Sequence, residues 1–392
     1  MKVLLVTPSF YPATVYGGPI FSTLHTSQEL AKLDDMEIYV STTNANMTSR
    51  LDVKMGKWQQ FEKDFYVKYY NETKINLISI SLLFNIWREI KSADLIHAQY
   101  MFSTPTPIAL FYSKVFNKPI VLSPRGALCK WCLNQGSKYK KSWLKIFIKP
   151  YIHKIIWHAT AEQEKNEILE QFPNAKIQVI PNGIAYNEFQ IFNQLDRKAF
   201  IKKFAKKDLQ CNQIVVSMGR LQKKKGFDIL IEAFIKVKNN FPNVKLLIAG
   251  SDETEGINLL KQIEQLKLND TVFLVGEIYN QDKIDFLANA DIFALPSHNE
   301  NFGNVYIESL ASGTPIVASK GTPWQKVEKA NCGKWVNNTI DDTADAIIEI
   351  LKCNRNIMRK NSKMFAKKYD WSNIALEFKK LYTGINNDKN KS

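Results

Sequence analysis

Residues 214–250 read IVVSMGRLQKKKGFDILIEAFIKVKNNFPNVKLLIAG. Short runs rich in β-branched and aliphatic residues open and close this stretch, and residues 227–238 between them have helical spacing. Because the two runs are too apolar to alternate, they are typical of parallel strands covered by helices on both faces. The stretch therefore predicts a strand–helix–strand unit of a doubly wound α/β domain.

The same alternation extends over the rest of the chain. Further strands are predicted at residues 272–274, 292–295, 316–318 and 334–336, and in the first half at 3–7, 37–41, 95–97, 120–122, 158–160 and 177–180. A helix is expected from about Pro19 to Ala31, whereas residues 44–75 show no clear period and are interpreted as an excursion from the core.

Two Rossmann-like α/β domains account for this pattern. The turn signature Pro181-Asn182-Gly183 predicts a boundary between a domain of residues 1–183 and a domain of residues 184–375. Residues 376–392 are interpreted as the end of a C-terminal helix and a frayed tail. In many enzymes of this kind the strand ends of both domains face a central cleft, and ligands bind just beyond those ends.

Charge is the unusual feature of the composition. The 392 residues are 45% apolar and 23% charged, as in an ordinary globular protein, but they carry a formal net charge of +15. Such a surplus favours polyanionic partners: nucleic acid, an anionic membrane or phosphorylated ligands. Five cysteines, an odd number, favour a reducing compartment. With no signal peptide or membrane span recognisable, we expect a cytoplasmic protein, soluble or peripherally attached.

A basic loop bounded by glycines follows the predicted strand at Ile214. It runs from Gly219-Arg220 to Lys225-Gly226 and leads into a helix. Arg offers a planar fork of donors and Lys a compact charge, and the helix N-terminus adds positive potential, so the loop suits a diphosphate. A solvated basic loop is the alternative interpretation.

Two carboxylates lie beyond the predicted strand at residues 292–295. Glu300 falls in the loop and Glu308 about one turn into a helix that starts near Gly303. Such a pair can accept hydrogen bonds from sugar hydroxyls, while backbone N–H groups between them can meet phosphate oxygens. The segment therefore suits a nucleotide-sugar, although a capping Glu300 and an ordinary helix carboxylate at Glu308 would give the same spacing.

These motifs together resemble the family 4 glycosyltransferases. The resemblance rests on Gly17-Gly18, Gly219-Arg220 with Lys225-Gly226, and Glu300 with Glu308 followed by residues 310–317, LASGTPIV. Residues 122–126, 158–162 and 321–324 resemble a subgroup associated with bacterial surface polysaccharides. The resemblance implies the GT-B fold and retaining transfer of a sugar from a UDP- or GDP-linked donor, without a metal ion or further cofactor.

The resemblance also implies roles for individual residues. Arg220 and Lys225 would neutralise the departing diphosphate, and Glu300 would contact the donor sugar. Glu308 would bind the ribose hydroxyls. The donor site would also include Gly17, Gly18, Arg125, Gly219 and the backbone amides of Phe302, Gly303, Asn304 and Val305.

The first domain departs from the family pattern at one position. Many members carry a histidine after the strand at residues 120–122, where this chain has Arg125. Arg125 could bind the sugar or diphosphate, but it stays protonated and suits no acid–base step. His97 is a second candidate for the cleft, or else a structural histidine.

Much of the basic surplus lies in one stretch. Residues 95–161 contain no Asp or Glu but ten Lys and Arg. Residues 139–157 show the apolar spacing of a helix, which Pro150 should kink or split, with Lys138, Lys145 and Lys149 along one flank. The segment suits an anionic membrane surface or an acceptor carrying pyrophosphate, unless it packs internally with its lysines in solvent.

The leading hypothesis is a retaining glycosyltransferase that extends a glycan acceptor, linked to polyprenyl pyrophosphate, in bacterial surface-polysaccharide synthesis, such as that of O-antigen or capsule. A GT-B-like nucleotide-sugar epimerase would bind the same donor without an acceptor. A basic nucleic-acid-binding protein is the non-enzymatic alternative, but no nucleic-acid module is recognisable, so we expect no nucleic-acid partner.

Overall fold

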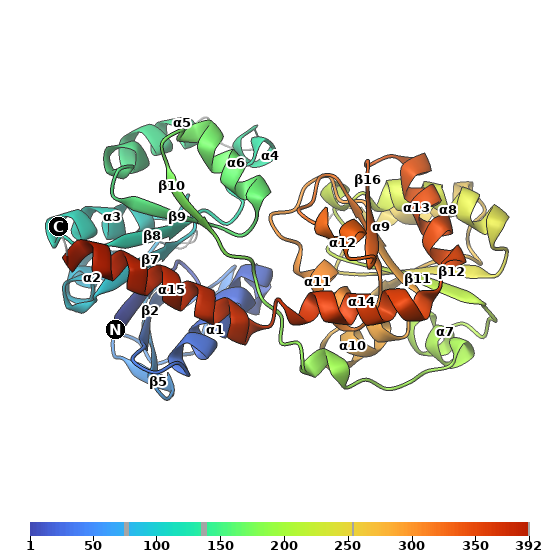
Figure 1. The fold of residues 1–392 in the computed structure, drawn as a ribbon, viewed down its shortest axis with the longest axis horizontal. Helices are drawn as coiled ribbons and strands as arrows, with labels where there is room; N and C mark the ends of the chain where they lie inside the picture. Colours follow the sequence, from blue (N-terminus) through green and yellow to red (C-terminus); the bar gives the residue numbers. More distant parts are fainter. Residues whose placement is uncertain (74–77, 135–138, 253–254, 391–392) are drawn as a thin grey trace. The chain divides into compact units, whose positions relative to one another are not determined.

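The structure is a computed structural model that describes residues 1–73, 78–134, 139–252 and 255–390. It divides into two compact units, of which unit 1 contains residues 1–183 and 371–392 and unit 2 contains residues 184–370. Each unit has its own parallel sheet and hydrophobic core (Figure 1). The predicted α/β class with two Rossmann-like domains is therefore confirmed.

Unit 2 is a six-stranded sheet in the order β13-β12-β11-β14-β15-β16, with every pairing parallel. The strand order reverses between β11 and β14, which are hydrogen-bonded neighbours. From β11 the next strands are added towards one edge of the sheet, and from β14 they are added towards the other edge. The strands are β11 Gln213–Met218, β12 Val244–Ala249, β13 Val272–Gly276, β14 Ile292–Leu295, β15 Ile316–Ser319 and β16 Gly333–Val336. Ligands in doubly wound sheets bind beyond the strand ends at this reversal.

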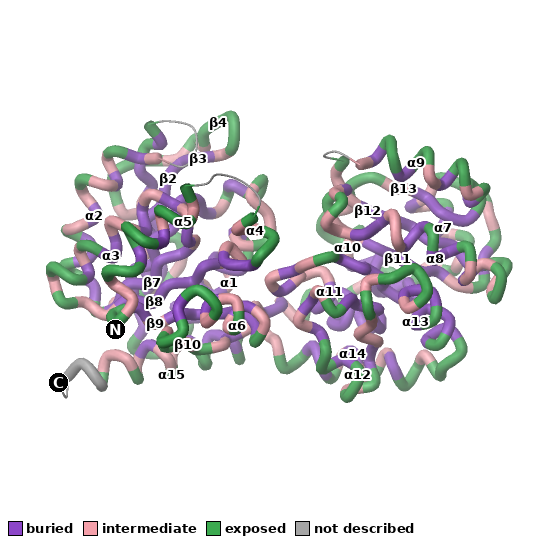
Figure 2. Tube along the Cα trace, turned by 90° about the horizontal axis from the view of Figure 1, so that it is seen from above, coloured by how far each residue is buried: buried purple, intermediate pink, exposed green. Residues whose placement is uncertain are grey.

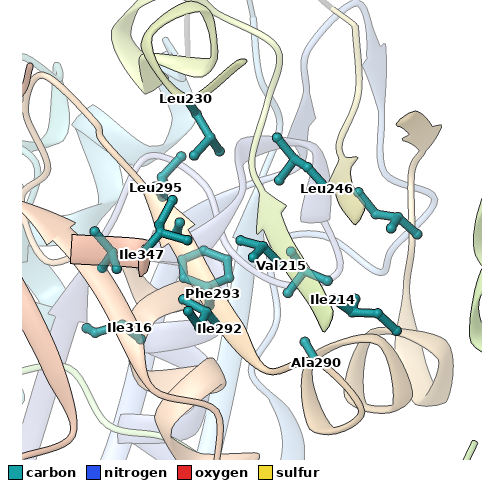
Figure 3. Packing of buried hydrophobic residues seen from close by; sticks show 14 of the residues in the cluster. Ile214, Val215, Leu230, Leu246, Ala290, Ile292, Phe293, Leu295, Ile316 and Ile347 are labelled. Atoms are coloured by element: carbon teal, nitrogen blue, oxygen red, sulfur yellow. The ribbon is translucent and has the colours of Figure 1, made fainter. Parts of the chain in front are cut away.

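Helices cover the sheet of unit 2 and bury its strands. Helix α8 packs against α13, and α11 packs against α14. The helices are α7 Arg197–Ala205, α8 Phe227–Asn240, α9 Gly256–Gln265, α10 Asn280–Ala288, α11 Asn304–Ala311, α12 Lys326–Lys329, α13 Ile340–Lys352 and α14 Arg355–Lys367, with a 3-10 turn at Glu188–Gln190. Figure 3 shows Val215, Phe293 and Ile347 in the resulting core.

Unit 1 contains an eight-stranded sheet in the order β10-β9-β8-β7-β1-β2-β6-β5. Only its last pair, β5 with β6, is antiparallel. The strands are β1 Lys2–Val6, β2 Glu37–Thr43, β5 Gln59–Glu62, β6 Phe65–Tyr70, β7 Leu95–Gln99, β8 Ile120–Ser123, β9 Ile155–Ala159 and β10 Lys176–Val179; β3 Ala45–Asn46 and β4 Ser49–Arg50 form a separate pair. The buried strands form the interior of the unit in Figure 2.

The longer helices of unit 1 are α1 Gly18–Ala31, α2 Ile80–Ser92, α3 Pro105–Val115, α6 Glu162–Gln171 and α15 Trp371–Asn390. Helix α15, red in Figure 1, packs against α1. Residues 371–375 therefore belong to unit 1, not to a second domain of residues 184–375, and residues 376–390, predicted as a helix end with a frayed tail, are helical throughout. The physical reason is burial, because Ile374, Phe378 and Tyr382 of α15 lie in the core of unit 1.

One further expectation was wrong, and another was right only in part. Residues 44–75 are not an excursion, because Phe65–Tyr70 forms β6, paired in parallel with β2. The apolar segment at 139–157 is interrupted, as expected from Pro150, but its last part is not helical: α5 Tyr139–Trp143 is followed by a π-type turn Leu144–Ile148, a 3-10 turn Lys149–Tyr151 and then β9. Pro150 cannot continue an α-helical hydrogen-bond ladder, and the β-branched run at Ile155 enters the sheet instead.

The remaining short elements of unit 1 are a 3-10 turn Thr14–Tyr16 and α4 Lys130–Asn134. Within the described parts of both units, no helix is at once long and apolar enough to span a membrane.

Candidate active site

The candidate active site of unit 2 is built on the two loops that follow β11 and β14, the neighbouring strands at the sheet reversal. The first loop contains Gly219 to Gly226 and the second begins at Pro296. Both start where parallel strands end, which is the edge at which doubly wound sheets bind ligands.

Glycines shape the basic loop. A Cβ on Gly219 would lie 3.3 Å from Cε of Lys225, so the lysine side chain folds closely over this position. Gly226 has a φ of 68°, and a Cβ there would lie 2.2 Å from the carbonyl oxygen of Pro296. The chain can thus turn directly from the 3-10 turn Lys223–Lys225 into α8.

Lys225 and Glu300 form the central ion pair of unit 2. Lys225 Nζ lies 2.5 Å from Glu300 Oε1, and the two side chains are only 16% and 11% exposed. Ser297 Oγ lies 2.9 Å from the same carboxylate oxygen. Burial by itself would raise the pKa of Glu300, but Lys225, with help from Lys224 and Ser297, holds the pKa below its usual value. Glu300 is therefore an ionised, buried acceptor.

Backbone hydrogen bonds fix the loop that carries Glu300. The N–H of His298 donates to the carbonyl of Lys224 at 2.8 Å, and the N–H of Glu300 donates to the carbonyl of Gly321 at 3.0 Å. A Cβ on Gly321 would lie 2.3 Å from the carbonyl oxygen of His298, so the two segments pack too closely for any residue but glycine at position 321. The carboxylate is thus held in place independently of any ligand.

Helix α11 begins at the position expected from the sequence. Gly303 precedes it with a φ of 76°, where a Cβ would lie 2.7 Å from the ring of Tyr306. Asn304 and Val305 form its first turn, whose N–H groups point away from the helix. The side chain of Phe302 is instead buried against Trp324, with ring centroids 5.0 Å apart, so only its backbone can serve a ligand.

Glu308 and Glu300 have different partners. Glu308 Oε1 lies 2.9 Å from Nζ of Lys283, a residue of α10. Arg220, at the start of the basic loop, is exposed. Unit 2 therefore presents two separately neutralised carboxylates and an arginine on the loops and helix beyond its strand ends.

In unit 1, Gly17 has a φ of 77° and Gly18 is the first residue of α1. Arg125 follows β8 and also has a positive φ, 57°. Its Nε donates to Oε1 of Gln99 at 2.8 Å and its Nη1 to Oδ1 of Asn182 at 3.2 Å. Both acceptors are neutral amides, so they orient the guanidinium without cancelling its charge.

His97 is buried in unit 1, with 1% of its surface exposed. Its Nδ1 lies 2.7 Å from the hydroxyl of Tyr382 and its Nε2 lies 2.7 Å from Oγ of Ser123. His97 is therefore a structural histidine inside unit 1, the second of the two alternatives given by the sequence, and it is not exposed to a cleft.

The basic segment presents apolar side chains beside its lysines. Ile146 is 60% and Phe147 38% exposed, and Lys145 and Lys149 are also exposed. Lys138, the third lysine of the predicted flank, lies outside the described residues.

Comparison with known proteins decides the family. Residues 16–188 match the family described as Glycosyltransferase Family 4, and residues 198–369 match the family described as Glycosyl transferases group 1. The chain belongs to the family 4 glycosyltransferases. The first matched region lies in unit 1 except for its last few residues and includes Arg125, and the second lies in unit 2 and includes both candidate loops.

This family 4 glycosyltransferase matches curated relatives over part of their length. It is 35% identical over 172 residues to the capsular polysaccharide biosynthesis glycosyltransferase CapM of Staphylococcus aureus, covering 43% of this chain and 41% of CapM. It is 27% identical over 228 residues to the D-inositol 3-phosphate glycosyltransferase of Mycolicibacterium smegmatis, covering 57% and 50% of the two chains. The alignments thus span about half the length of these relatives or less.

Solved structures extend the likeness to the whole fold. Anabaena HepE in complex with UDP superimposes with a TM-score of 0.72 and 17% identity, covering 98% of this chain and 100% of HepE. WaaG, a glycosyltransferase involved in lipopolysaccharide biosynthesis, gives 0.68 and 15%, covering 98% and 100%. The chain therefore has the GT-B fold.

Sequence reasoning missed the side chains that hold the predicted ones. Ser297 and Lys283 contact the two carboxylates, while Gln99 and Asn182 orient Arg125. Position after a strand was an available signal for Ser297 and Gln99. The pairing of Lys283 with Glu308 depends on how α10 packs against α11, which no local pattern specifies.

Proposed function

We propose that this family 4 glycosyltransferase transfers a sugar from a nucleotide-sugar to a glycan acceptor, with the donor held mainly by unit 2. The observation that carries the proposal is the buried Lys225–Glu300 pair beside Gly219, at the sheet reversal. The group combines a cation for phosphate with a fixed carboxylate for sugar hydroxyls. Structures of the GT-B relative HepE with UDP and with UDP-glucose support a donor of this class.

The proposed chemistry is a metal-independent transfer with retention. The acceptor hydroxyl oxygen forms a bond to the anomeric carbon as the bond from that carbon to the phosphate oxygen breaks. The leaving phosphate oxygen takes the hydroxyl proton, so charge and protons balance. Lys225 and Arg220 stabilise the departing diphosphate, and Glu300, which is tied to Lys225 and Ser297, orients the sugar instead of acting as a nucleophile. Glu308 binds the ribose. Gly17, Gly18 and Arg125 keep their predicted roles as proposals.

The proposed acceptor is a glycan on polyprenyl pyrophosphate, handled at the cytoplasmic face of a membrane. The role of CapM in capsular polysaccharide biosynthesis supports a surface-polysaccharide pathway. Exposed Ile146 and Phe147 next to Lys145 and Lys149 support peripheral contact with an anionic bilayer, since apolar side chains insert while lysines meet lipid phosphates.

Turnover of donors tests the function. Wild-type protein is incubated in EDTA with UDP-glucose or GDP-mannose and a polyprenyl-pyrophosphate-linked sugar, and products are identified by mass spectrometry and anomeric NMR. We expect an enlarged acceptor with the donor's anomeric configuration. A 2-epimer of the donor sugar, formed without acceptor, would identify an epimerase. Salt-sensitive binding to nucleic acid without any response to nucleotides would overturn the proposal.

Co-sedimentation tests the membrane contact separately. Vesicles of phosphatidylglycerol and phosphatidylcholine should pellet the wild type and release the Lys145→Glu/Lys149→Glu variant. Lys326→Glu/Lys329→Glu on α12 of unit 2 is the matched control, with the same change of charge on exposed lysines. Equal pelleting of all three proteins would contradict docking through residues 144–149.

A further inference from the structure

Four buried polar side chains near Arg125 form a continuous series of hydrogen bonds inside unit 1, which we call the hydrogen-bond chain. The hydroxyl of Tyr382 on α15 lies 2.7 Å from Nδ1 of His97, and Nε2 of His97 lies 2.7 Å from Oγ of Ser123. Oγ of Ser123 in turn lies 2.6 Å from Nδ1 of His158, whose Nε2 lies 2.8 Å from the carbonyl oxygen of Ile180. All four side chains are 1% exposed or less.

The carbonyl at one end determines the direction of every hydrogen bond. A carbonyl only accepts, so Nε2 of His158 carries hydrogen. Burial, reinforced by the charge of Arg125, lowers the pKa of His158 to about 3, so the ring is neutral and its Nδ1 accepts from Ser123. Ser123 has then used its one hydrogen and accepts from Nε2 of His97. Burial also lowers the pKa of His97, whose Nδ1 accepts from Tyr382.

The hydrogen-bond chain lies next to both residues that bind Arg125, Gln99 and Asn182. Gln99, which accepts from Nε of Arg125, has its amide nitrogen 3.2 Å from Nε2 of His97. Because both nitrogens carry hydrogen in this arrangement, they form no hydrogen bond with each other, and the ring of His97 limits the position of the Gln99 amide by steric contact alone. At the other end, Ile180 lies two residues before Asn182, which accepts from Nη1 of Arg125.

Helix α15 covers one side of the hydrogen-bond chain. The ring of Phe378 lies 4.8 Å from that of His158 and 5.8 Å from that of His97, measured between centroids. Phe378 and Tyr382, one turn apart, thus cover both histidines and supply the first donor. Water is kept from the chain, and neutral rings do not compete with a ligand for the charge of Arg125.

We propose that Tyr382, His97, Ser123 and His158 are positioning residues that hold Gln99 and Asn182, and through them orient the Arg125 guanidinium toward substrate oxygens. Because Tyr382 lies on α15, the hydrogen-bond chain makes this helix part of the substrate-binding apparatus of unit 1. The proposal rests on the proposed function only for what Arg125 binds. The orientation of Arg125 itself can be tested without turnover.

Hydrogen exchange of the Arg125 Nε–H, followed by NMR, is the first test. Tyr382→Phe removes the first donor and keeps the ring, and we expect exchange about tenfold faster than in the wild type, since one hydrogen bond is worth about this factor. Ser123→Ala, which breaks the chain at its middle, should give the same result and serves if Tyr382→Phe does not fold. Ser113→Ala is the control, because that buried hydroxyl donates to the carbonyl of Leu110 at 2.8 Å, away from Arg125. If Tyr382→Phe and Ser123→Ala fold and their Arg125 Nε–H exchanges at the wild-type rate, the proposal is overturned.

A double-mutant cycle gives the second test. Tyr382→Phe should lower kcat about tenfold in the wild type, with the KM for the nucleotide-sugar within about twofold, and by less than about twofold in an Arg125→Ala background. An equal loss in both backgrounds would identify a merely structural role and overturn the proposal. If the wild type transfers no sugar at all, the proposed function fails, whereas the exchange measurement still decides the positioning chain.

Discussion

The two units place polar side chains beyond parallel strands but treat charge in opposite ways. In unit 2, each candidate carboxylate is paired with a lysine, Glu300 with Lys225 and Glu308 with Lys283. In unit 1, the candidate donor-binding cation Arg125 is held by the neutral amides of Gln99 and Asn182. The difference indicates what each unit can give to a ligand.

In the largely buried Lys225–Glu300 pair each charge offsets part of the desolvation cost of the other, and Ser297 adds a hydrogen bond to the carboxylate, so the pair can remain in the protein without a ligand. Lys225 can then exchange part of its contact with Glu300 for a diphosphate, at little net cost in charge. Arg125 is hydrogen-bonded by neutral amides and has no direct ion-pair partner to exchange among the described residues, although the carboxylate of Glu164 lies near enough to interact with its charge. We therefore expect unit 2 to recognise the donor by exchange of partners and unit 1 to act through a fixed positive charge.

The largest expected effect is that of Lys225→Ala. It removes the cation proposed to stabilise the leaving diphosphate, and we expect kcat to fall about 100- to 1,000-fold, as for the loss of one strong charge stabiliser. The pKa of Glu300 should also rise, because burial is then opposed by fewer charges. Steady-state rates with saturating donor measure kcat. A loss of kcat no greater than that in Lys283→Ala would show that the Lys225–Glu300 pair is no more important for transfer than the Lys283–Glu308 pair.

Arg125→Ala tests the other side of the comparison. We expect a fall in kcat of about 100-fold, and Arg125→Lys should recover little of it because lysine lacks the fork that reaches both Gln99 and Asn182. Rates of the two variants, measured at equal folded fraction, check this. Full activity of Arg125→Lys would show that charge alone suffices and that orientation is unimportant.

These contrasts also show what the sequence could predict. The strands of unit 2 and the positions of Lys225, Glu300 and Glu308 follow from local apolar runs and from residues next to them. The partners do not, because Glu300 meets a lysine 75 residues away and His97 meets a tyrosine 285 residues away. Strand β6 was missed because its aromatic alternation is irregular, and residues 139–157 were misread because an apolar run with helical spacing can also enter a sheet.

A smaller, pH-dependent effect is expected at Asp285 in the core of unit 2. Burial opposes ionisation, but bonds from Asn193, Gln281 and Lys203 lower the pKa of Asp285 from 3.8 to about 2. A depressed pKa stabilises the fold above the unfolded pKa near 4, and the stabilisation is lost as pH falls through about 2. The contribution is about 2 kcal/mol at neutral pH.

Asp285→Asn should therefore lower the free energy of unfolding of unit 2 by about 2 kcal/mol at pH 7 and by much less near pH 2. Hydrogen exchange of the amides of β11 and β14 measures this local stability. The amides of β7 and β8 in unit 1 are the internal control and should not change. A loss that is the same at both pH values would contradict the ionised state of Asp285.

The smallest expected effect is that of Lys283→Ala. Glu308 loses its ion pair but keeps its proposed bond to the ribose, so KM for the donor should rise about threefold with kcat unchanged. Donor saturation curves measure both constants. A large fall in kcat would place Lys283 at the reacting atoms and would require a different account of the α10–α11 pair.

Calorimetric titration of nucleotide-sugar donors in EDTA tests whether Lys225 binds the donor. The wild type, Lys225→Ala and Lys283→Ala are each titrated with UDP-glucose and GDP-mannose. We expect saturable binding of at least one donor to the wild type, binding to Lys225→Ala that is weaker by about tenfold or more, and only a small loss of affinity in Lys283→Ala. Binding of neither donor to the wild type, or equal affinity for the wild type and Lys225→Ala, would contradict it.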